Sequence, residues 1–377
     1  MPQQLTVSDC KLVLQSLLSA ELSAYRGIAI PCWQEPTDVD SLELLHLASC
    51  VNEFFCLHET GSEDRLLMTK SLDDWAALVA NATCETSGLM FRTSGSTGNP
   101  TSHHHKWEHI KAEVDSLSFV LLSSKPIKRV VSWLPLHHLY GFMLGMAFPA
   151  MATIPQLAVT DAVLPKLSSG DLLVTVPPRW EYLARSRRAW EPAIYGVSST
   201  GELSEHTSSS LLSQGLSGLL DIYGSTETGG IAARWLPKTS YQLLKHWQSG
   251  CDAQHIQREN DGAELPLLDN AEWYNERHFV LKGRLDELIS IGGVNVSVTY
   301  VGQKLRALES VADCTVRVAK QGAQLRLKAF VIPRTSEDET ATEINNAIKL
   351  WPAAERPVQI TYGTALPTNE MGKLTDW

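Results

Sequence analysis

Short apolar runs alternate with helical patterns through the middle of this chain, and this alternation restricts the folds that it can adopt. Runs typical of β-strands occur at residues 130–134, 172–176, 193–197 and 219–223, separated by turn-forming residues. Helical patterns lie between them. Strands that alternate with helices build a layered α/β sheet, whose ligands bind at the loops that follow the strands. We therefore predict an α/β fold with its site at those loops.

The sequence pattern changes after residue 284. A helix is predicted over 300–308, two strands over 314–319 and 325–332, and a last helix near 344–350, with a charged, Thr-rich linker at 335–342. This order describes a compact α+β unit of roughly 90 residues, which is a normal domain size. We place the boundary at Asp286. The predicted domains are a large α/β domain over 1–285 and a small α+β domain over 286–377.

Charge and cysteine usage limit the classes of partner. The formal net charge of −10 argues against broad binding to nucleic acid or to an anionic membrane, because both need a positive field. The seven cysteines form no CxxC pair, which favours reduced thiols, and the N-terminus lacks the pattern of a signal peptide. We therefore expect a cytoplasmic protein.

One long segment lacks charged side chains. Residues 130–160 contain no Lys, Arg, Asp or Glu, and a segment of this length could span a bilayer. Pro135, Pro149, Pro155, Gly141 and Gly145 interrupt it, however. Such frequent breaks favour buried strand–loop–helix structure, so we expect no membrane span.

A run of small and hydroxyl-bearing residues points to bound phosphate. It consists of Thr93, Ser94, Gly95, Ser96, Thr97 and Gly98. Glycine lets the backbone approach a ligand closely, and consecutive N–H groups can form a nest for an anion. A Ser/Gly-rich surface linker is the alternative for such a run taken alone. Three later segments complete a nucleotide site: residues 222–228, residues 283–289 and the pair Gly372-Lys373.

The order and spacing of these four segments resemble the adenylate-forming superfamily, which includes acyl- and aryl-CoA synthetases, luciferases and the adenylation domains of peptide synthetases. The resemblance runs from about residue 88 to the C-terminus. It implies a large N-terminal domain and a small mobile C-terminal domain. The phosphate loop begins early for this superfamily, at residue 93, which implies a truncated first subdomain.

The resemblance implies roles in binding ATP. The loop at 93–98 would hold the β- and γ-phosphates, and residues 197–203 would stack on adenine, with Ser199 also reaching the acid. In the next motif the Tyr223 ring would face adenine, the Thr226 hydroxyl would contact the α-phosphate and Glu227 would bind Mg²⁺. The remaining residues of these motifs assigned to the nucleotide are Thr200, Gly201, Glu202 and Gly224. Gly224 would also line the acid site.

One residue departs from the family pattern near the phosphates. Thr101 stands where the family usually has a lysine after the proline of the loop. Lys106 lies five residues further on and is a candidate for supplying the missing charge.

Further motifs imply the ribose site, the acid site and the moving parts. Asp269 and Arg284 would bind the ribose hydroxyls, although Asp269 lacks the usual Thr-Gly before it. The acid pocket would open at residues 133–142, where the resemblance assigns His138, Tyr140 and Gly141. Asp286 would be the hinge of the C-terminal domain, and Lys373 would reach the reacting carboxylate and α-phosphate.

The implied activity is that of an ATP- and Mg²⁺-dependent acid–thiol ligase. It would activate an aryl or acyl carboxylic acid as an acyl-adenylate and pass it to a pantetheine thiol, on CoA or on an acyl carrier protein. Within the superfamily the chain looks most like compact bacterial ligases of aryl polyene-type pathways, with succinylbenzoate–CoA ligase as another compact relative. The alternatives are transfer to a non-thiol acceptor and a degenerate nucleotide-binding protein.

A zinc site at the adjacent histidines is a separate alternative. His103, His104 and His105 offer imidazole nitrogens. Adjacent imidazoles diverge, and no Cys or Asp lies at a suitable spacing in the sequence.

Overall fold

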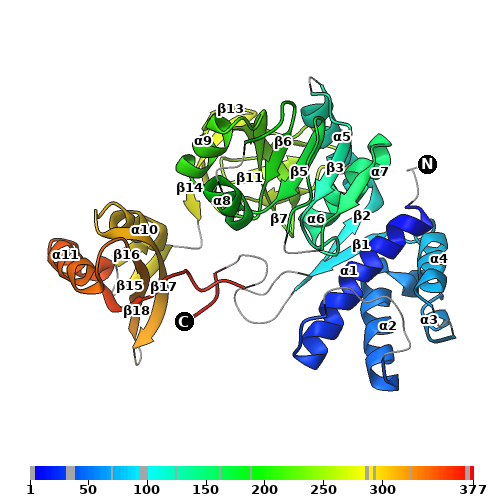
Figure 1. Ribbon diagram of the computed structural model, residues 1–377, viewed down its shortest axis with the longest axis horizontal. Coiled ribbons are helices and arrows are strands. Elements are labelled where there is room, and N and C mark those ends of the chain that lie inside the picture. The colour runs from blue at the N-terminus through cyan, green and yellow to red at the C-terminus, as the bar shows by residue number, and fades with distance from the viewer. Residues whose placement is uncertain are drawn as a thin grey trace. The chain divides into compact units, whose positions relative to one another are not determined.

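The structure is a computed structural model, and it describes residues 5–30, 39–68, 71–92, 101–123, 125–160, 163–186, 189–201, 203–284, 288–291, 294–321, 324–369 and 374–377. The chain divides into two compact units, which we describe separately. The first comprises Met1–Gln248 with Arg258–Asp261, and the second Ser249–Gln257 with Gly262–Trp377. Figure 1 shows their elements, coloured along the chain. The predicted boundary at Asp286 lies outside the described residues and stays a prediction.

The first unit begins with helices, most of which start at a capping side chain. They are α1 (Val7–Arg26), α2 (Ser41–Phe55), α3 (Arg65–Met68) and α4 (Leu72–Ala82), with a 3₁₀ turn at Leu57–Glu59. Thr6 and Asp40 form capping boxes on α1 and α2, and Ser71 caps α4. Each cap satisfies backbone N–H groups that have no partner within the helix. Helix α1 packs against both α2 and α4 (Figure 1).

Two antiparallel strands and a long helix follow. The strands are β1 (Gly88–Arg92) and β2 (Ser102–Lys106), and the helix α5 (Trp107–Leu122) starts directly after β2. The helical spacing of apolar residues at 110, 114, 117 and 121 predicts a helix over 107–122, and these are the bounds of α5. The four apolar residues on its predicted face are buried: Ile110, Val114, Leu117 and Leu121.

The central sheet of the first unit is mostly parallel. Its strands, in spatial order, are β9 (Tyr241–Leu243), β8 (Gly229–Trp235), β7 (Gly218–Ser225), β6 (Tyr195–Ser198), β5 (Asp171–Thr175), β3 (Arg129–Ser132) and β4 (Gln156–Ala158). Strands β4, β3, β5, β6 and β7 run parallel, whereas β8 and β9 are antiparallel additions. All four predicted strands are present, each within two residues of its predicted start.

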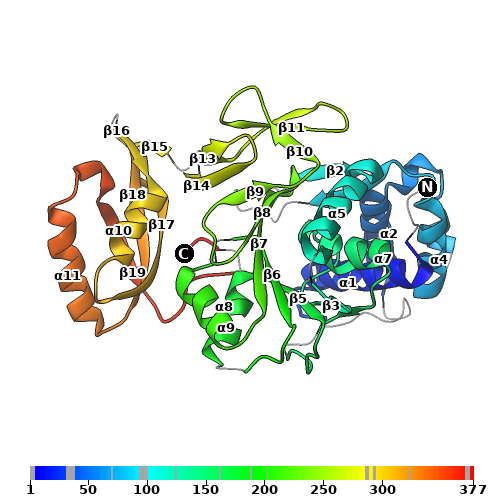
Figure 2. The same cartoon turned by 90° about the horizontal axis from the view of Figure 1, so that it is seen from above.

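Helices cover both faces of this sheet. Helices α8 (Pro177–Arg185) and α9 (Glu205–Ser213) lie on one face, and α5 and α7 (Phe148–Ala152) lie on the other (Figures 1 and 2). The core under α8 and α9 centres on Trp180, which is fully buried and donates from its ring N–H to the Val197 carbonyl at 3.2 Å. This alternation of strand and helix confirms the predicted α/β fold.

The uncharged segment at 130–160 forms strand, loop and short helices, as predicted. After β3 the chain continues through α6 (Leu139–Phe142), a π-helical turn (Met143–Ala147) and α7 to β4. Among the described residues, no helix combines the length and the apolar character that crossing a bilayer requires.

The described residues of the second unit form mostly antiparallel strand pairs, one parallel pair and two helices. Short strands β11 (His255–Arg258) and β12 (Glu264–Pro266) pair, as do β13 (Asp269–Asn275) with β14 (His278–Arg284) and β15 (Leu288–Ile291) with β16 (Val294–Ser297). Strand β10 (Trp247–Ser249) pairs with β11. A sheet of β17 (Val311–Gln321), β18 (Gln324–Pro333) and β19 (Pro357–Tyr362), in which β18 and β19 are the parallel pair, packs with α10 (Val298–Arg306) and α11 (Glu337–Lys349) around a core that includes Val301, Leu327 and Ile344.

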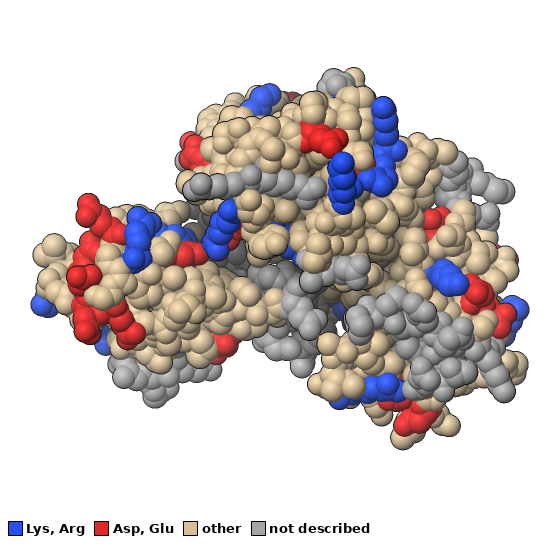
Figure 3. Space-filling model, in the orientation of Figure 1, with Lys and Arg blue, Asp and Glu red and all other residues tan. Residues whose placement is uncertain are grey.

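The predicted linker at 335–342 is wrong for most of its length. Helix α11 begins at Glu337, where a capping box with Ser336 as the N-cap and Glu339 at the third position starts it. The charged residues belong to the exposed first turn, where acidic side chains favour the helix N-terminus. Figure 3 shows acidic side chains gathered over this helix. The Ser-x-x-Glu signal was present in the sequence.

Gly196 in β6 allows the core to close around Trp180. A Cβ at this position would lie 2.6 Å from the Trp180 ring and 2.8 Å from Leu219. We expect Gly196→Ala to lower the free energy of unfolding by about 1–3 kcal/mol through overpacking. Urea unfolding followed by tryptophan fluorescence measures this. Gly201→Ala is the control, because its Cβ would approach no atom closer than 3.8 Å. Equal midpoints for the two variants would contradict the packing argument.

Candidate active site

The candidate site lies where parallel strands of the first unit end. Strands β5, β6 and β7 run in the same direction, so their carboxyl ends meet at one edge of the sheet. The predicted adenine segment follows β6 there. The buried Ser199 hydroxyl donates to the carbonyl of Ile222 in β7 at 2.7 Å, which ties the two strand ends together. Thr200 has a φ of +75°, so the chain turns sharply before Gly201.

The end of β7 carries Tyr223 and Gly224, and the turn from β7 to β8 carries Thr226 and Glu227. The Tyr223 ring lies 5.8 Å from that of Tyr241. A side chain at position 224 would meet the Gly229 carbonyl at 2.2 Å, so only glycine fits. Hydrogen bonds between Ser225 and Thr228 close the turn, with the two hydroxyl oxygens 3.1 Å apart. The turn therefore has one defined shape.

A buried, neutral histidine holds this turn from the interior of the unit. The His105 Nε2 lies 2.7 Å from the backbone oxygen of Thr226 and donates to it. Burial lowers the pKa of His105 to about 4, although the bond to Thr226 opposes this. The ring is therefore uncharged near neutral pH, with its proton on the nitrogen that faces the turn.

A buried carboxyl group of α5 supports the other end of the turn. Burial raises the pKa of Glu113 to about 8, while a hydrogen bond from the Gly230 backbone N–H acts in the opposite direction. A Cβ at Gly229 or Gly230 would lie 2.3 Å or 2.8 Å from the Glu113 oxygens. Two consecutive glycines are thus needed to admit this carboxyl group. The Trp247 ring N–H adds a bond to the Gly230 carbonyl at 2.9 Å.

Glu227 is the exposed carboxylate of the site. Its side chain is 43% exposed, and one oxygen lies 3.7 Å from Nε2 of His103. The same nitrogen is 3.0 Å from the Thr101 hydroxyl. His103 therefore lies between Thr101, which replaces the family's lysine, and the predicted metal ligand. Lys106 is exposed and lies 3.7 Å from Glu108.

The predicted acid pocket residues lie at the start of α6. His138 is the N-cap of α6, and its ring centroid is 4.2 Å from that of His137. The Tyr140 hydroxyl donates to the carbonyl of Thr175 at the end of β5, at 3.4 Å, and burial raises its pKa well above the usual value. A Cβ on Gly141 would lie 2.1 Å from the Pro135 carbonyl. Tyr140 thus lies at the same sheet edge as Ser199.

The predicted ribose residues are paired in the backbone register of two strands of the second unit. Asp269 in β13 and Arg284 in β14 are register partners, although fifteen residues separate them in sequence. The other predicted residues lie outside the described part of the chain: Thr93, Ser94, Gly95, Ser96, Thr97, Gly98, Glu202, Asp286 and Lys373.

Two side chains that hold the turn from the interior, Glu113 and His105, were not predicted from the sequence. Helix α5 was predicted from its apolar face, and Glu113 lies three residues after Ile110 and one before Val114, on that same face. The available signal was a glutamate on the apolar face of a helix, together with the Gly229-Gly230 pair in a later turn. For His105 no pattern in the sequence separated it from its two neighbours.

Glu113 makes stability depend on pH. Between the ordinary glutamate pKa of 4.5 and about 8, the folded state keeps this proton and the unfolded state loses it, so stability falls as pH rises through this window. We expect Glu113→Gln to remove this contribution. The measurement is the free energy of unfolding of wild type minus that of the variant, at several pH values. A difference that does not fall toward pH 8 would refute the assignment.

Known proteins resemble this chain along its full length. A 4-coumarate–CoA ligase of Halorhodospira halophila is 42% identical over 394 aligned residues, covering 99% of this chain and 100% of that protein. Another, from Rhodobacter capsulatus, is 33% identical and covers 91% of both chains. No protein-family model matches the sequence.

A solved structure shares the fold. The O-succinylbenzoate coenzyme A synthetase of Bacillus subtilis, in complex with ATP and magnesium ion, matches with a TM-score of 0.60 over 97% of this chain and 92% of that one, at 14% identity. The sequence relatives and this shared fold confirm the resemblance derived from the motifs. The chain belongs to the adenylate-forming superfamily, among its acid–thiol ligases.

Proposed function

We propose that this protein is an ATP-dependent aryl acid–CoA ligase whose substrate is a hydroxycinnamic acid of the 4-coumarate type. The observation that carries the proposal is the 42% identity to a 4-coumarate–CoA ligase, which extends over the whole of that protein. A second ligase of the same name at 33% identity supports the same acid class. Substrate pockets differ between distant members of a superfamily, so full-length identity at this level is more informative than the shared fold.

The reaction requires activation of a carboxylate. Attack of a carboxylate oxygen on the α-phosphorus of ATP forms an acyl-adenylate and releases pyrophosphate. A thiolate of CoA then attacks the acyl carbon, a thioester forms and AMP leaves. Negative charges meet in the first step, so catalysis depends on positioning and on charge neutralisation.

The nucleotide is assigned to the carboxyl edge of the sheet. Ser199, Thr200 and Gly201 after β6, with Glu202, would lie along the adenine, and Tyr223 and Gly224 would form its other boundary. The loop at 93–98, which follows β1, would bind the β- and γ-phosphates. In the second unit, Asp269 and Arg284 would bind the ribose hydroxyls, which their pairing across β13 and β14 supports.

Glu227 is suited to hold Mg²⁺, and Thr226 to contact the α-phosphate beside it. Glu227 presents an exposed carboxylate, and Thr226 adds a hydroxyl on a turn that buried hydrogen bonds fix. Hard cations prefer such oxygen ligands together with phosphate. When bound, Mg²⁺ neutralises charge on the phosphates. The chain's own part is to keep these two side chains in place.

The acid is assigned to the region between α6 and the strand ends. His138, Tyr140 and Gly141 contribute one side, and Ser199 and Gly224 the other. The segment after Tyr140 is apolar and buried from Phe142 to Phe148. An aromatic ring suits such surroundings better than a charged group does.

The small domain is assigned the second half of the reaction. Residues 286–377 would turn about Asp286, so that Lys373 serves the adenylation step and then gives way to the thiol. Exchange of catalytic groups by domain motion also excludes water from the intermediate. CoA is the proposed acceptor, and an acyl carrier protein is the competing one.

Carboxylate-dependent ATP–pyrophosphate exchange tests the function. The assay compares hydroxycinnamates, benzoates, succinylbenzoate and C4–C12 fatty acids without thiol, followed by thioester formation with CoA or with a phosphopantetheinyl carrier protein. We expect exchange with hydroxycinnamates and thioester formation with CoA. Exchange with fatty acids alone would overturn the substrate class. No exchange by a folded, ATP-binding protein would favour a degenerate binder, and transfer only to the carrier protein or to an amine would overturn the acceptor.

Lys373 has a prediction of its own. We expect Lys373→Ala to lower the adenylation rate by at least ~100-fold, because a charge that acts at the transition state is lost. Thioester formation from a preformed coumaroyl-adenylate should stay within about threefold of wild type. Separate assays of the two half-reactions measure this. An adenylation rate close to wild type would show that the lysine assignment is wrong.

Glu227 is predicted to act through Mg²⁺. We expect Glu227→Ala to raise the Mg²⁺ concentration needed for half-maximal exchange by at least ~10-fold, since one anionic ligand is removed. The readout is exchange rate against Mg²⁺ concentration at fixed ATP. Glu108→Ala, which removes an exposed carboxylate from the first turn of α5, is the control. Identical Mg²⁺ curves for both variants would refute the role.

A further inference from the structure

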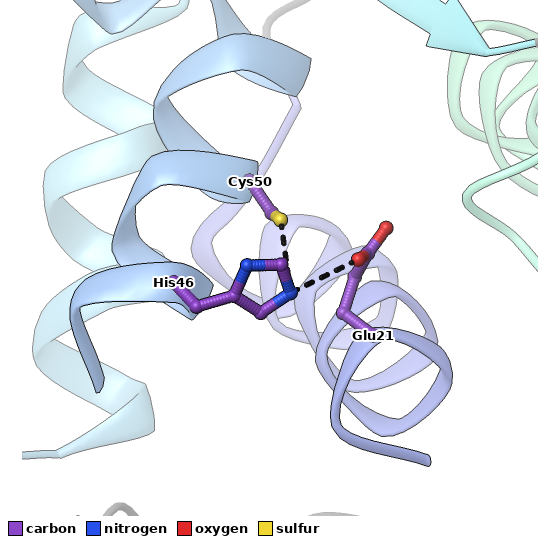
Figure 4. Close-up of side chains that lie close together, drawn as sticks. All are labelled: Glu21, His46 and Cys50. Atoms are coloured by element: carbon purple, nitrogen blue, oxygen red, sulfur yellow. Dashed lines mark hydrogen bonds and ion pairs between the residues drawn. The ribbon is translucent and has the colours of Figure 1, made fainter. Parts of the chain in front are cut away.

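Three ligand-type side chains converge between α1 and α2, and none of them is assigned to ATP or to the acid. His46 and Cys50 lie one turn apart on α2, and Glu21 reaches them from α1 (Figure 4). The His46 Nε2 is 3.4 Å from Oε2 of Glu21 and 3.8 Å from Sγ of Cys50. All three atoms lie within 4.8 Å of one another.

These separations suit a shared metal ion. Zinc binds Cys sulfur at about 2.3 Å and His nitrogen or carboxylate oxygen at about 2.0–2.2 Å, so tetrahedral ligands lie about 3.3–3.6 Å apart. The observed 3.4 Å and 3.8 Å are close to this spacing. The Cys50 thiol is also hydrogen-bonded to Glu21, so each of the three side chains contacts the other two, as ligands of one ion do.

The surroundings fit a divalent cation in charge. The second oxygen of Glu21, Oε1, lies 3.5 Å from Nη1 of Arg92, and Arg92 also pairs with Glu53. With Cys50 as a thiolate, Glu21, Glu53 and Cys50 would carry three negative charges and Arg92 one positive charge. A divalent ion neutralises the difference. Arg92 contacts the oxygen that does not face His46, so it orients the carboxylate without occupying the shared point.

The neighbouring ring and the exposure of the cluster complete the environment. The Tyr25 ring lies 5.3 Å from the His46 ring and limits its orientation. Cys50 is buried, while the side chains of His46 and Glu21 are 37% and 22% exposed. Water can therefore reach the exposed side and supply a fourth ligand.

We propose that Glu21, His46 and Cys50 form a Zn²⁺ site that links α1 to α2, with water as the fourth ligand. Binding forms Zn–O, Zn–N and Zn–S bonds, and the Cys50 S–H bond breaks with its proton released to solvent. No oxidation or reduction takes place. Because unfolding would separate the two helices, the bound ion stabilises the folded chain.

Two other groupings in the described residues are weaker candidates. The first grouping is Cys56, Glu59 and His104. Both oxygens of Glu59 already accept hydrogen bonds from Ser87, at 2.6 Å. The second grouping is Cys251, Asp252 and His255, all in one exposed turn. Asp252 accepts hydrogen bonds from His255 at 2.7 Å and from the Gln254 N–H at 2.8 Å. Local hydrogen bonds thus account for both, and they provide matched controls.

Cobalt substitution tests the proposal without reference to catalysis. Full-length protein is treated with chelator and titrated with Co²⁺, which gives a thiolate-to-metal charge-transfer band only when a cysteine is a ligand. Zn²⁺ is then added to displace Co²⁺, and thermal unfolding is measured with and without Zn²⁺. The test variants are Cys50→Ser and His46→Gln, and the controls are Cys251→Ser and Cys56→Ser.

We expect one Co²⁺ per chain, loss of the band in Cys50→Ser and at least ~10-fold weaker binding in His46→Gln. Zn²⁺ should raise the unfolding temperature of wild type and both controls but of neither test variant. His46→Gln keeps the buried thiol of Cys50, so this variant still tests the metal site if Cys50→Ser fails to fold. A band that persists without Cys50, a band lost in either control, or no stoichiometric binding would overturn the site.

Discussion

The geometry of the candidate active site depends on buried hydrogen bonds beneath the turn between β7 and β8. His105 donates to Thr226, and Glu113 accepts from Gly230, so both ends of the turn are held from the interior. Both groups are uncharged near neutral pH because burial shifts their pKa values toward the neutral forms. Glu227, whose side chain is exposed, is thus carried by a turn that the interior holds in place.

This support joins elements that are distant in sequence. Strand β2 supplies His105, helix α5 supplies Glu113, and the start of β10 supplies Trp247. The Gly229-Gly230 pair is the matching feature of the turn, since any side chain there would meet the Glu113 oxygens. The proposed zinc site would act on a different part of the same unit, where α1 and α2 pack, and it neighbours Arg92 at the end of β1.

Local sequence patterns predicted most of the helices and strands, but they did not predict the buried side chains that hold the β7–β8 turn. Helix α5 and the parallel strands follow from spacing that any single segment displays, so their bounds agree with the structure. The start of α11 was missed because its first turn is entirely polar, and a polar turn resembles a linker unless the Ser336–Glu339 capping box is recognised. The roles of His105 and Glu113 depend on partners more than 110 residues away, which no local pattern contains.

The most direct test of the account is a crystal structure of the full chain with coumaroyl-adenylate, or with ATP and Mg²⁺. We expect adenine beside Ser199 and Thr200 and against Tyr223, with the α-phosphate near Thr226 and the His105 and Glu113 hydrogen bonds unchanged. Nucleotide bound elsewhere, or a β7–β8 turn rebuilt on binding, would contradict the claim that the support is formed in advance.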